Sequence, residues 1–255
     1  SSSGRFLSSR VKYWRYVCAQ KLNLPETQFE ARESLLRQHP LSYHNLLING
    51  SDQRMQTYLS QNKVSRVGFR SNIRPDLNDM IRLSELLIEK KEFGLALEIL
   101  DKHEDQLSTL EPEVRLYLAL LVNRTGNSIA KFKMMTALFQ DEPQMVTPST
   151  LKLVFPIWFL DKIKSRAQHV DPFLILSLIR QESAFNRFAR SGVGARGLMQ
   201  VMPETARGIA SVKSSSQLYD PETNIRVGVK YFLHRLENLD GDIELTLAAY
   251  NAGLK

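Results

Sequence analysis

The chain has 255 residues, a formal net charge of +7 at pH 7, 43% hydrophobic residues and 24% charged residues. This composition is that of an ordinary globular protein with room for one large or two modest domains, and no apolar run reaches the ~20 residues that span a bilayer. The single cysteine excludes an internal disulfide, and the histidines lack the spacing of a metal site, so no metal or other cofactor is expected.

The N-terminal part of the chain, up to about residue 165, shows apolar residues at helical spacing throughout. Two later pairs of helical segments each contain a glycine, Gly94 and Gly126, whose separation lies in the range of helical-hairpin repeats such as the tetratricopeptide type. We therefore expect a short α-superhelix of repeat-like hairpins with no sheet. Cys18 belongs to the first apolar stripe and is predicted to be buried and inert. That stripe consists of Val11, Trp14, Val17, Cys18 and Leu22.

A strongly apolar helix is predicted to begin at Asp171. Asp171 is a suitable cap, and Pro172 suits the first helical position, where a missing N–H costs nothing. Residues 173–182 are apolar at almost every step, so this helix should be mostly buried. Glu182 extends the apolar face that includes Ile179. A carboxyl group there is partly desolvated, which raises its pKa towards the value that a general acid needs near neutrality.

The residues around Glu182 leave its role open. Four arginines lie close to it in sequence, and a neighbouring arginine lowers the pKa of a carboxyl group. A glutamate in the last turns of a buried helix is also commonly salt-bridged to such an arginine. These arginines are Arg180, Arg187, Arg190 and Arg196.

Two further motifs follow Glu182 along the chain. The loop from Ser191 to Gln200 contains three glycines, Gly192, Gly194 and Gly197, which are expected to serve backbone geometry. The second motif, at residues 248–253, has the pattern of a helix that ends in a glycine cap. Each motif alone is weak, but an acid on a helix, a glycine loop and this helix end form a specific ordered triplet.

The triplet resembles the three signature motifs of the soluble lytic transglycosylases, peptidoglycan exotransglycosylases with a goose-lysozyme-like catalytic domain. The resemblance runs from about residue 169 to residue 253. It implies an all-α fold, with a superhelix over residues 1–165 and a lysozyme-like α-helical catalytic domain over residues 166–255. Relatives continue through further helices, so this domain is expected to be C-terminally truncated. The matching motifs are Glu182-Ser183, Gly197-Leu198-Met199-Gln200 and Ala249-Tyr250-Asn251-Ala252-Gly253.

The resemblance also implies a reaction, cleavage of the β-1,4 bond between N-acetylmuramic acid and N-acetylglucosamine with formation of a 1,6-anhydro product. Glu182 would act first as the acid and then as the base. Core packing is an equally weighted alternative for Met199, because methionine fills irregular gaps well. The substrate-binding residues implied by the resemblance are Ser191, Met199, Gln200, Tyr250 and Asn251. The structural ones are Ser183, Gly192, Gly194, Gly197 and Gly253.

Two other functions remain open, a catalytically silent glycan-binding or scaffolding helical protein and a muramidase-type hydrolase. The positive net charge suits a polyanion such as peptidoglycan, and the motifs of nucleic-acid-binding proteins are missing, so we expect no nucleic-acid partner. Glycan strands are the expected substrate, and other cell-wall proteins are expected partners of the helical region. The implied location is the periplasm or cell envelope, although residues 1–4 show no feature of a signal peptide.

Overall fold

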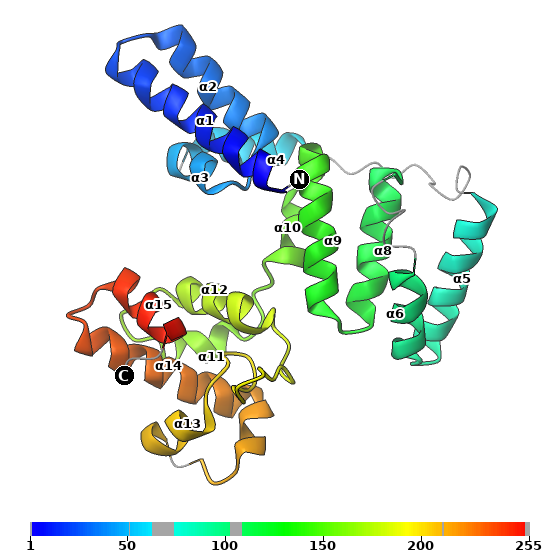
Figure 1. Cartoon of the computed structure of the whole chain (residues 1–255), viewed down its shortest axis with the longest axis vertical. Coiled ribbons are helices and arrows are strands. Elements are labelled where there is room, and N and C mark those ends of the chain that lie inside the picture. The colour runs from blue at the N-terminus through cyan, green and yellow to red at the C-terminus, as the bar shows by residue number, and fades with distance from the viewer. Residues whose placement is uncertain (1, 51, 63–73, 103–108, 211, 253–255) are drawn as a thin grey trace. The chain divides into compact units, whose positions relative to one another are not determined.

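The structure is a computed structural model that describes residues 2–50, 52–62, 74–102, 109–210 and 212–252. Within these ranges the backbone forms 14 α-helices and two 3-10 helices, and the extended pairings are isolated bridges at residues 190–201. The all-α prediction is confirmed. No described helix has the length and apolarity needed to cross a membrane. The chain divides into two compact units, residues 1–125 with 130–154, and residues 126–129 with 155–255 (Figure 1).

The first unit is built of helical hairpins. Several of its helices start with a proline, whose fixed φ suits the first helical turn and whose missing N–H would have no partner there. Helix α1 packs along α2, and α3 contacts both. The helices are α1 (Ser2–Lys21), α2 (Pro25–Gln38), α3 (Tyr43–Asn49), α4 (Gln53–Gln61), α5 (Pro75–Glu89), α6 (Phe93–Asp101), α8 (Pro112–Arg124), α9 (Ser128–Asp141) and α10 (Pro148–Val154), with the 3-10 helix η2 (Pro143–Met145) before α10.

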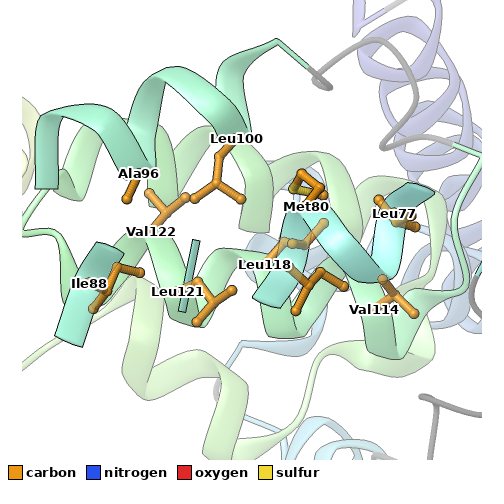
Figure 2. Packing of buried hydrophobic residues seen from close by; sticks show 10 residues of the cluster. Leu77, Met80, Ile88, Ala96, Leu100, Val114, Leu118, Leu121 and Val122 are labelled. Atoms are coloured by element: carbon orange, nitrogen blue, oxygen red, sulfur yellow. The ribbon is translucent and has the colours of Figure 1, made fainter. Parts of the chain in front are cut away.

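A hydrophobic cluster joins α5, α6 and α8. Its residues recur at helical spacing along α5 and α8, so each helix presents one apolar face to the others. Figure 2 shows these side chains directed into a common interior. Full burial of such a side chain is worth roughly 1.5–3 kcal/mol, so the cluster is a major source of stability for the hairpins. The members are Leu77, Met80, Ile81, Ile88, Ala96, Leu100, Val114, Leu118, Leu121 and Val122.

The apolar stripe of α1 does not face the core. Val11 and Trp14 are 59% and 52% exposed, and Cys18 is exposed as well. The buried face of α1 carries Ser9 and Ala19, each 2% exposed. The predicted burial of Cys18 is therefore wrong. Apolar spacing defines a face of a helix, but the neighbouring helices determine which face is covered.

The turn between α5 and α6 is formed without Gly94. Gly94 lies inside the first turn of α6, and the chain reverses at Lys91, which has a φ of 64°. The N–H of Glu92 donates to the carbonyl of Leu87 at 2.8 Å, closing a left-handed helix cap. Gly126 does lie in a turn, between α8 and α9, with a φ of 81°. A lysine in the left-handed conformation thus replaces the expected turn glycine.

The second unit is arranged around α14. This helix is capped by Asp220, whose carboxylate accepts a hydrogen bond from the N–H of Thr223 at 2.9 Å, and Pro221 occupies its first turn. It contacts α11, α13, α15 and η3, while α12 packs against α11. Much of α14 is therefore buried, which places it where several functional elements meet. The helices of this unit are α11 (Leu160–Lys164), α12 (Pro172–Ser183), α13 (Pro203–Ile209), the 3-10 helix η3 (Ser215–Tyr219), α14 (Pro221–Asn238) and α15 (Ile243–Ala252).

Candidate active site

Helix α12 presents Glu182 in its last turn. The helix begins as predicted, with Asp171 accepting a hydrogen bond from the N–H of Phe173 at 2.8 Å and with Pro172 in its first turn. It ends after Ser183, where Ala184 has a φ of 51°. Four apolar residues of this helix are buried, and their side chains anchor it in the core. They are Ile175, Leu176, Leu178 and Ile179.

The carboxyl group of Glu182 is half-buried and has no charged partner in the described part of the chain. Burial raises its pKa above the ordinary carboxyl value. Among the described residues none forms an ion pair or a hydrogen bond with it. The salt-bridged alternative for Glu182 is therefore not found in the described part of the chain, and desolvation determines the direction of the pKa shift.

Three of the four neighbouring arginines lie over aromatic rings. The guanidinium of Arg180 lies 4.8 Å from the ring centroid of Phe155, and that of Arg187 lies 4.4 Å from the ring of Phe188. Arg196 lies over a third ring, that of Tyr219, at 5.6 Å. Such cation–π contacts help to hold these three side chains in place. These arginines are thus close to Glu182 in sequence but do not form ion pairs with it.

The raised pKa of Glu182 has a consequence for stability. Below the ordinary carboxyl pKa the group is neutral in both the folded and the unfolded chain. As pH rises towards the raised folded value, the unfolded chain releases its proton first, so the folded state loses stability. Glutamine does not titrate, so Glu182→Gln is expected to raise the Tm at neutral pH and to lose this advantage in acid.

Thermal unfolding of both chains between about pH 4 and pH 8 measures this difference. Glu237→Gln serves as the control, because Glu237 is exposed on α14. A Tm difference that grows in acid rather than near neutrality would contradict the expected sign.

The glycine loop lies next to Glu182 and is shaped by its own hydrogen bonds. The hydroxyl of Ser191 accepts a hydrogen bond from the N–H of Ala195 at 3.0 Å. Gly194 and Gly197 have φ values of 96° and 75°, which favour glycine. A Cβ on Gly197 would lie only 2.2 Å from the carbonyl oxygen of Leu218. Gly197 is therefore required for both its dihedral angle and its close approach.

The other residues predicted to have a structural role at the site differ in whether the fold requires them. Gly192 has no positive φ, and a Cβ there would meet nothing within 4 Å, so the backbone does not require glycine at this position. Ser183 donates to the carbonyls of Ile179 at 3.1 Å and Leu198 at 2.7 Å, which ties the end of α12 to the loop. Gly253 lies outside the described residues.

A buried asparagine on α14, not identified from the sequence, holds the loop from the other side. Asn224 is 0% exposed and makes three hydrogen bonds of 2.8 Å. Its carbonyl oxygen accepts from the N–H of Met199, and its amide donates to the carbonyls of Arg196 and Leu218. Asn224 follows the polar residues Glu222 and Thr223 in the first turns of α14, so its residue type gives no sequence signal. Two of its partners, Met199 and Arg196, lie 25 and 28 residues away along the chain.

Met199 belongs to the core, which was one of its two predicted roles. Its side chain is 0% exposed, and a Cβ on Gly228 of α14 would lie 2.4 Å from its sulfur atom. The missing Cβ of Gly228 therefore makes room for Met199. The side chain of Met199 does not line the cleft, but its carbonyl oxygen accepts a hydrogen bond from the hydroxyl of Tyr250 at 2.8 Å.

Tyr250 connects α15 to the glycine loop near Glu182. Burial raises the pKa of its hydroxyl, and the neighbouring Glu182 and Tyr231 raise it further. The hydroxyl therefore keeps its proton and remains a donor at neutral pH. Its ring lies 5.3 Å from the ring of Tyr231 and 6.2 Å from that of Phe232, centroid to centroid.

These elements enclose a cavity of about 540 Å³. The structure brings five of the predicted site residues together in its wall, and Glu182 is the only carboxylate among the described residues there. The amide of Gln200 donates to the carbonyl of Gly197 at 2.8 Å, so the loop holds this side chain in place. Two residues that sequence reasoning missed, Tyr231 and Arg235 of α14, also line the cavity. The predicted residues in the wall are Glu182, Ser191, Gln200, Tyr250 and Asn251.

A larger cavity of about 980 Å³ lies on the hairpin unit, but its carboxylates are already paired. Glu33 forms an ion pair with Arg37 at 3.4 Å and lies 3.8 Å from Arg54. Asp141 pairs with Arg115 at 2.8 Å. No cluster of His, Cys, Asp and Glu that could hold a metal ion exists in the described parts of either unit. The unpaired acid makes the smaller cavity the candidate active site.

Comparison with known proteins assigns this part of the chain to a family. The profile of the Transglycosylase SLT domain matches residues 160–255. The soluble lytic murein transglycosylase of Escherichia coli K12 is 37% identical over 107 residues, which cover 39% of this chain and 17% of that protein. The membrane-bound lytic murein transglycosylase C of Haemophilus influenzae PittEE is 40% identical over 112 residues, covering 37% of this chain and 31% of that protein. The matched regions are thus less than a third of the length of either relative.

Solved structures resemble the chain over nearly its whole length. The 70 kDa soluble lytic transglycosylase of Escherichia coli aligns over 96% of this chain and 38% of its own, with a TM-score of 0.62 and 22% identity. An inactive mutant of lytic transglycosylase Slt from Pseudomonas aeruginosa aligns over 96% of this chain and 39% of its own, with a TM-score of 0.68 and 23% identity. At these identities the likeness concerns the fold, and it confirms helical hairpins followed by an SLT domain.

Proposed function

Residues 160–255 belong to the transglycosylase SLT domain family, and from this premise we propose that the protein is a lytic transglycosylase of peptidoglycan. It would cleave the β-1,4 bond between N-acetylmuramic acid and N-acetylglucosamine and leave a 1,6-anhydro-muramoyl end. One observation carries this proposal. Glu182 is the only carboxylate in the wall of the cavity among the described residues, and burial raises its pKa.

A single acid must serve twice in this reaction. Glu182 first donates its proton to the glycosidic oxygen while the bond from that oxygen to C1 breaks. The 2-acetamido group of the substrate stabilises the positive charge at C1. Glu182, now a carboxylate, then takes the proton of the muramoyl C6 hydroxyl, whose oxygen forms the new bond to C1. Glu182 is therefore protonated again at the end of the reaction, and no water is consumed.

The second carboxylate of ordinary glycosidases has no counterpart in the described wall of this cavity. Inverting enzymes use it to activate water, and retaining enzymes use it as the nucleophile. A site with one carboxylate favours a reaction in which the substrate supplies the nucleophile. The single carboxylate among the described wall residues therefore supports the transglycosylase over the muramidase-type hydrolase.

The other cavity residues receive roles that match their positions. Ser191 and Gln200, on the glycine loop, would contact the sugar near Glu182, and Asn251 would contact it from α15. Tyr250 would hold the loop through Met199 and present its ring to the cavity. These four residues bind and position the glycan, whereas Glu182 performs the chemistry.

Mass spectrometry of the soluble products tests the reaction type. Digestion of purified sacculi is expected to release muropeptides that are one water lighter than hydrolysis products, because the C6 hydroxyl replaces water. Mutanolysin digestion of the same sacculi provides the hydrolysed reference. Reducing-end products alone would identify a hydrolase, and glycan binding without any product would identify a scaffolding protein.

The wider assignment of the chain follows from the same premise. Residues 1–165 would form the hairpin region and residues 166–255 the catalytic domain. Peptidoglycan is a cell-envelope polymer, so the protein would act in the periplasm or on the envelope, with glycan strands as its substrate. The hairpin region would then be the surface for other cell-wall proteins.

A further inference from the structure

An arginine in the wall of the cavity lies on the same face of α14 as Tyr231. Tyr231 and Arg235 are four residues apart, and such residues are neighbours on a helix surface. The guanidinium carbon of Arg235 lies 4.9 Å from the ring centroid of Tyr231, which in turn lies 5.3 Å from the ring of Tyr250. Both Tyr231 and Arg235 line the cavity that contains Glu182. Tyr231 therefore holds a cation in the wall of the candidate active site.

Arg235 has no partner for its hydrogen-bond donors among the described residues. Its Nε atom is buried and makes no hydrogen bond, and no described carboxylate pairs with the guanidinium. By contrast, Arg115 of the hairpin unit donates to Asp141 at 2.8 Å. The buried Nε is out of reach of a ligand, as is the equally unpartnered Nε of Arg196. The accessible terminal nitrogens of Arg235, which have no described partner, are therefore the donors that a ligand in the cavity can reach.

The charges in the cavity indicate what that ligand carries. Arg235 is the only lysine or arginine in the described wall of the cavity, so it provides the positive charge of this site. A guanidinium binds a carboxylate through two parallel hydrogen bonds. N-acetylglucosamine carries no charge. A muramoyl unit that bears a peptide carries its carboxylates on that peptide, because the lactyl carboxyl is then an amide. A unit freed of its peptide carries a lactyl carboxylate instead.

Building on the proposed function, we propose that Arg235, held by Tyr231, binds a carboxylate on the lactyl-peptide arm of the muramoyl unit. This contact is a specificity determinant, because it favours peptidoglycan over neutral polymers of N-acetylglucosamine. Arg235 takes no part in proton transfer. The residue that distinguishes the two polymers therefore lies on α14, outside the three motifs by which the domain is identified.

Binding measurements separate this inference from catalysis. Calorimetry on the Glu182→Gln background compares three probes: peptide-bearing glycan strands, strands freed of peptide by an amidase, and the neutral N-acetylglucosamine hexamer. Adding Arg235→Gln is expected to weaken binding of a carboxylate-bearing probe about 10- to 100-fold, the value of charge-assisted hydrogen bonds. The hexamer should bind as before. Arg226→Gln, on the exposed face of α14, is the matched control.

The pattern of losses distinguishes the source of the carboxylate. A loss on peptide-bearing strands alone assigns the carboxylate to the peptide, and a loss on amidase-treated strands alone assigns it to the lactyl arm. Arg235→Lys keeps the charge but not the planar fork, so an intermediate loss is expected. Equal losses on all three probes, or no loss on any, would overturn the inference. Absence of anhydro products from the unsubstituted chain would instead refute the proposed function and leave these binding results standing.

Discussion

Glu182→Gln is expected to lower the release of soluble muropeptides from purified sacculi by about 10²–10⁴-fold, the usual value of general acid–base catalysis. The amide has nearly the same shape as the carboxyl group, but it can neither donate nor retrieve a proton. The cavity wall offers no other described carboxylate to take over this role. Binding of glycan strands should be retained.

Two controls make this result specific. Glu237→Gln changes an exposed glutamate of the same unit and should leave the rate unchanged. The circular dichroism spectrum of Glu182→Gln should match that of the unsubstituted chain, because the helix around residue 182 is fixed by its apolar neighbours. Near-normal lysis by Glu182→Gln would exclude the single-acid mechanism.

Asn224→Ala is expected to destabilise the second unit strongly. The substitution removes three hydrogen bonds and leaves the N–H of Met199 and the carbonyls of Arg196 and Leu218 without this partner. A buried group that loses its partner costs about 1–3 kcal/mol. The free energy of unfolding should therefore fall by roughly 3 kcal/mol or more, a large fraction of the ~5–15 kcal/mol typical of a domain.

The positions of the two tryptophans allow this unit to be followed separately. Trp158 packs edge-to-face on Phe185 with 5.8 Å between the ring centroids, and Trp14 belongs to the hairpin unit. In a Trp14→Phe background, urea unfolding monitored by fluorescence reports on Trp158 alone. Arg226→Ala is the control and should change the free energy by less than about 0.5 kcal/mol. An unchanged midpoint for Asn224→Ala would contradict the role of Asn224 in holding the loop.

Together, the two variants separate chemistry from architecture at this site. Glu182→Gln should lower turnover by the factor given above and, because it removes a partly desolvated carboxyl group, should not weaken the fold at neutral pH. Asn224→Ala should weaken the fold and lower activity only through the position of the loop. At this site the catalytic Glu182 lowers the stability of the fold at neutral pH, as its raised pKa implies. The buried amide of Asn224 increases that stability.

Local physical rules determined the helix that carries Glu182. The cap at Asp171, the proline after it and the apolar run to residue 182 act over a few residues, so the sequence was sufficient to predict α12 and the partial burial of its acid. The three ordered motifs likewise predicted the family of residues 160–255. The functional roles of Ser191, Gln200 and Asn251 stay predictions, because a residue can lie in a cavity wall without binding the ligand.

Only the tertiary structure decided which faces and partners were used. The stripe of α1 was apolar, but α2 and α3 cover the opposite face, which left Cys18 exposed. Met199 lies in the core because Gly228, 29 residues away, leaves room for its sulfur atom. Three of the four arginines near Glu182 lie over aromatic rings, while Asn224 and Arg235 reach the site from α14. The physical reason is common to all of these: helical periodicity is local, whereas burial, pairing and cavity walls depend on residues that are distant along the chain.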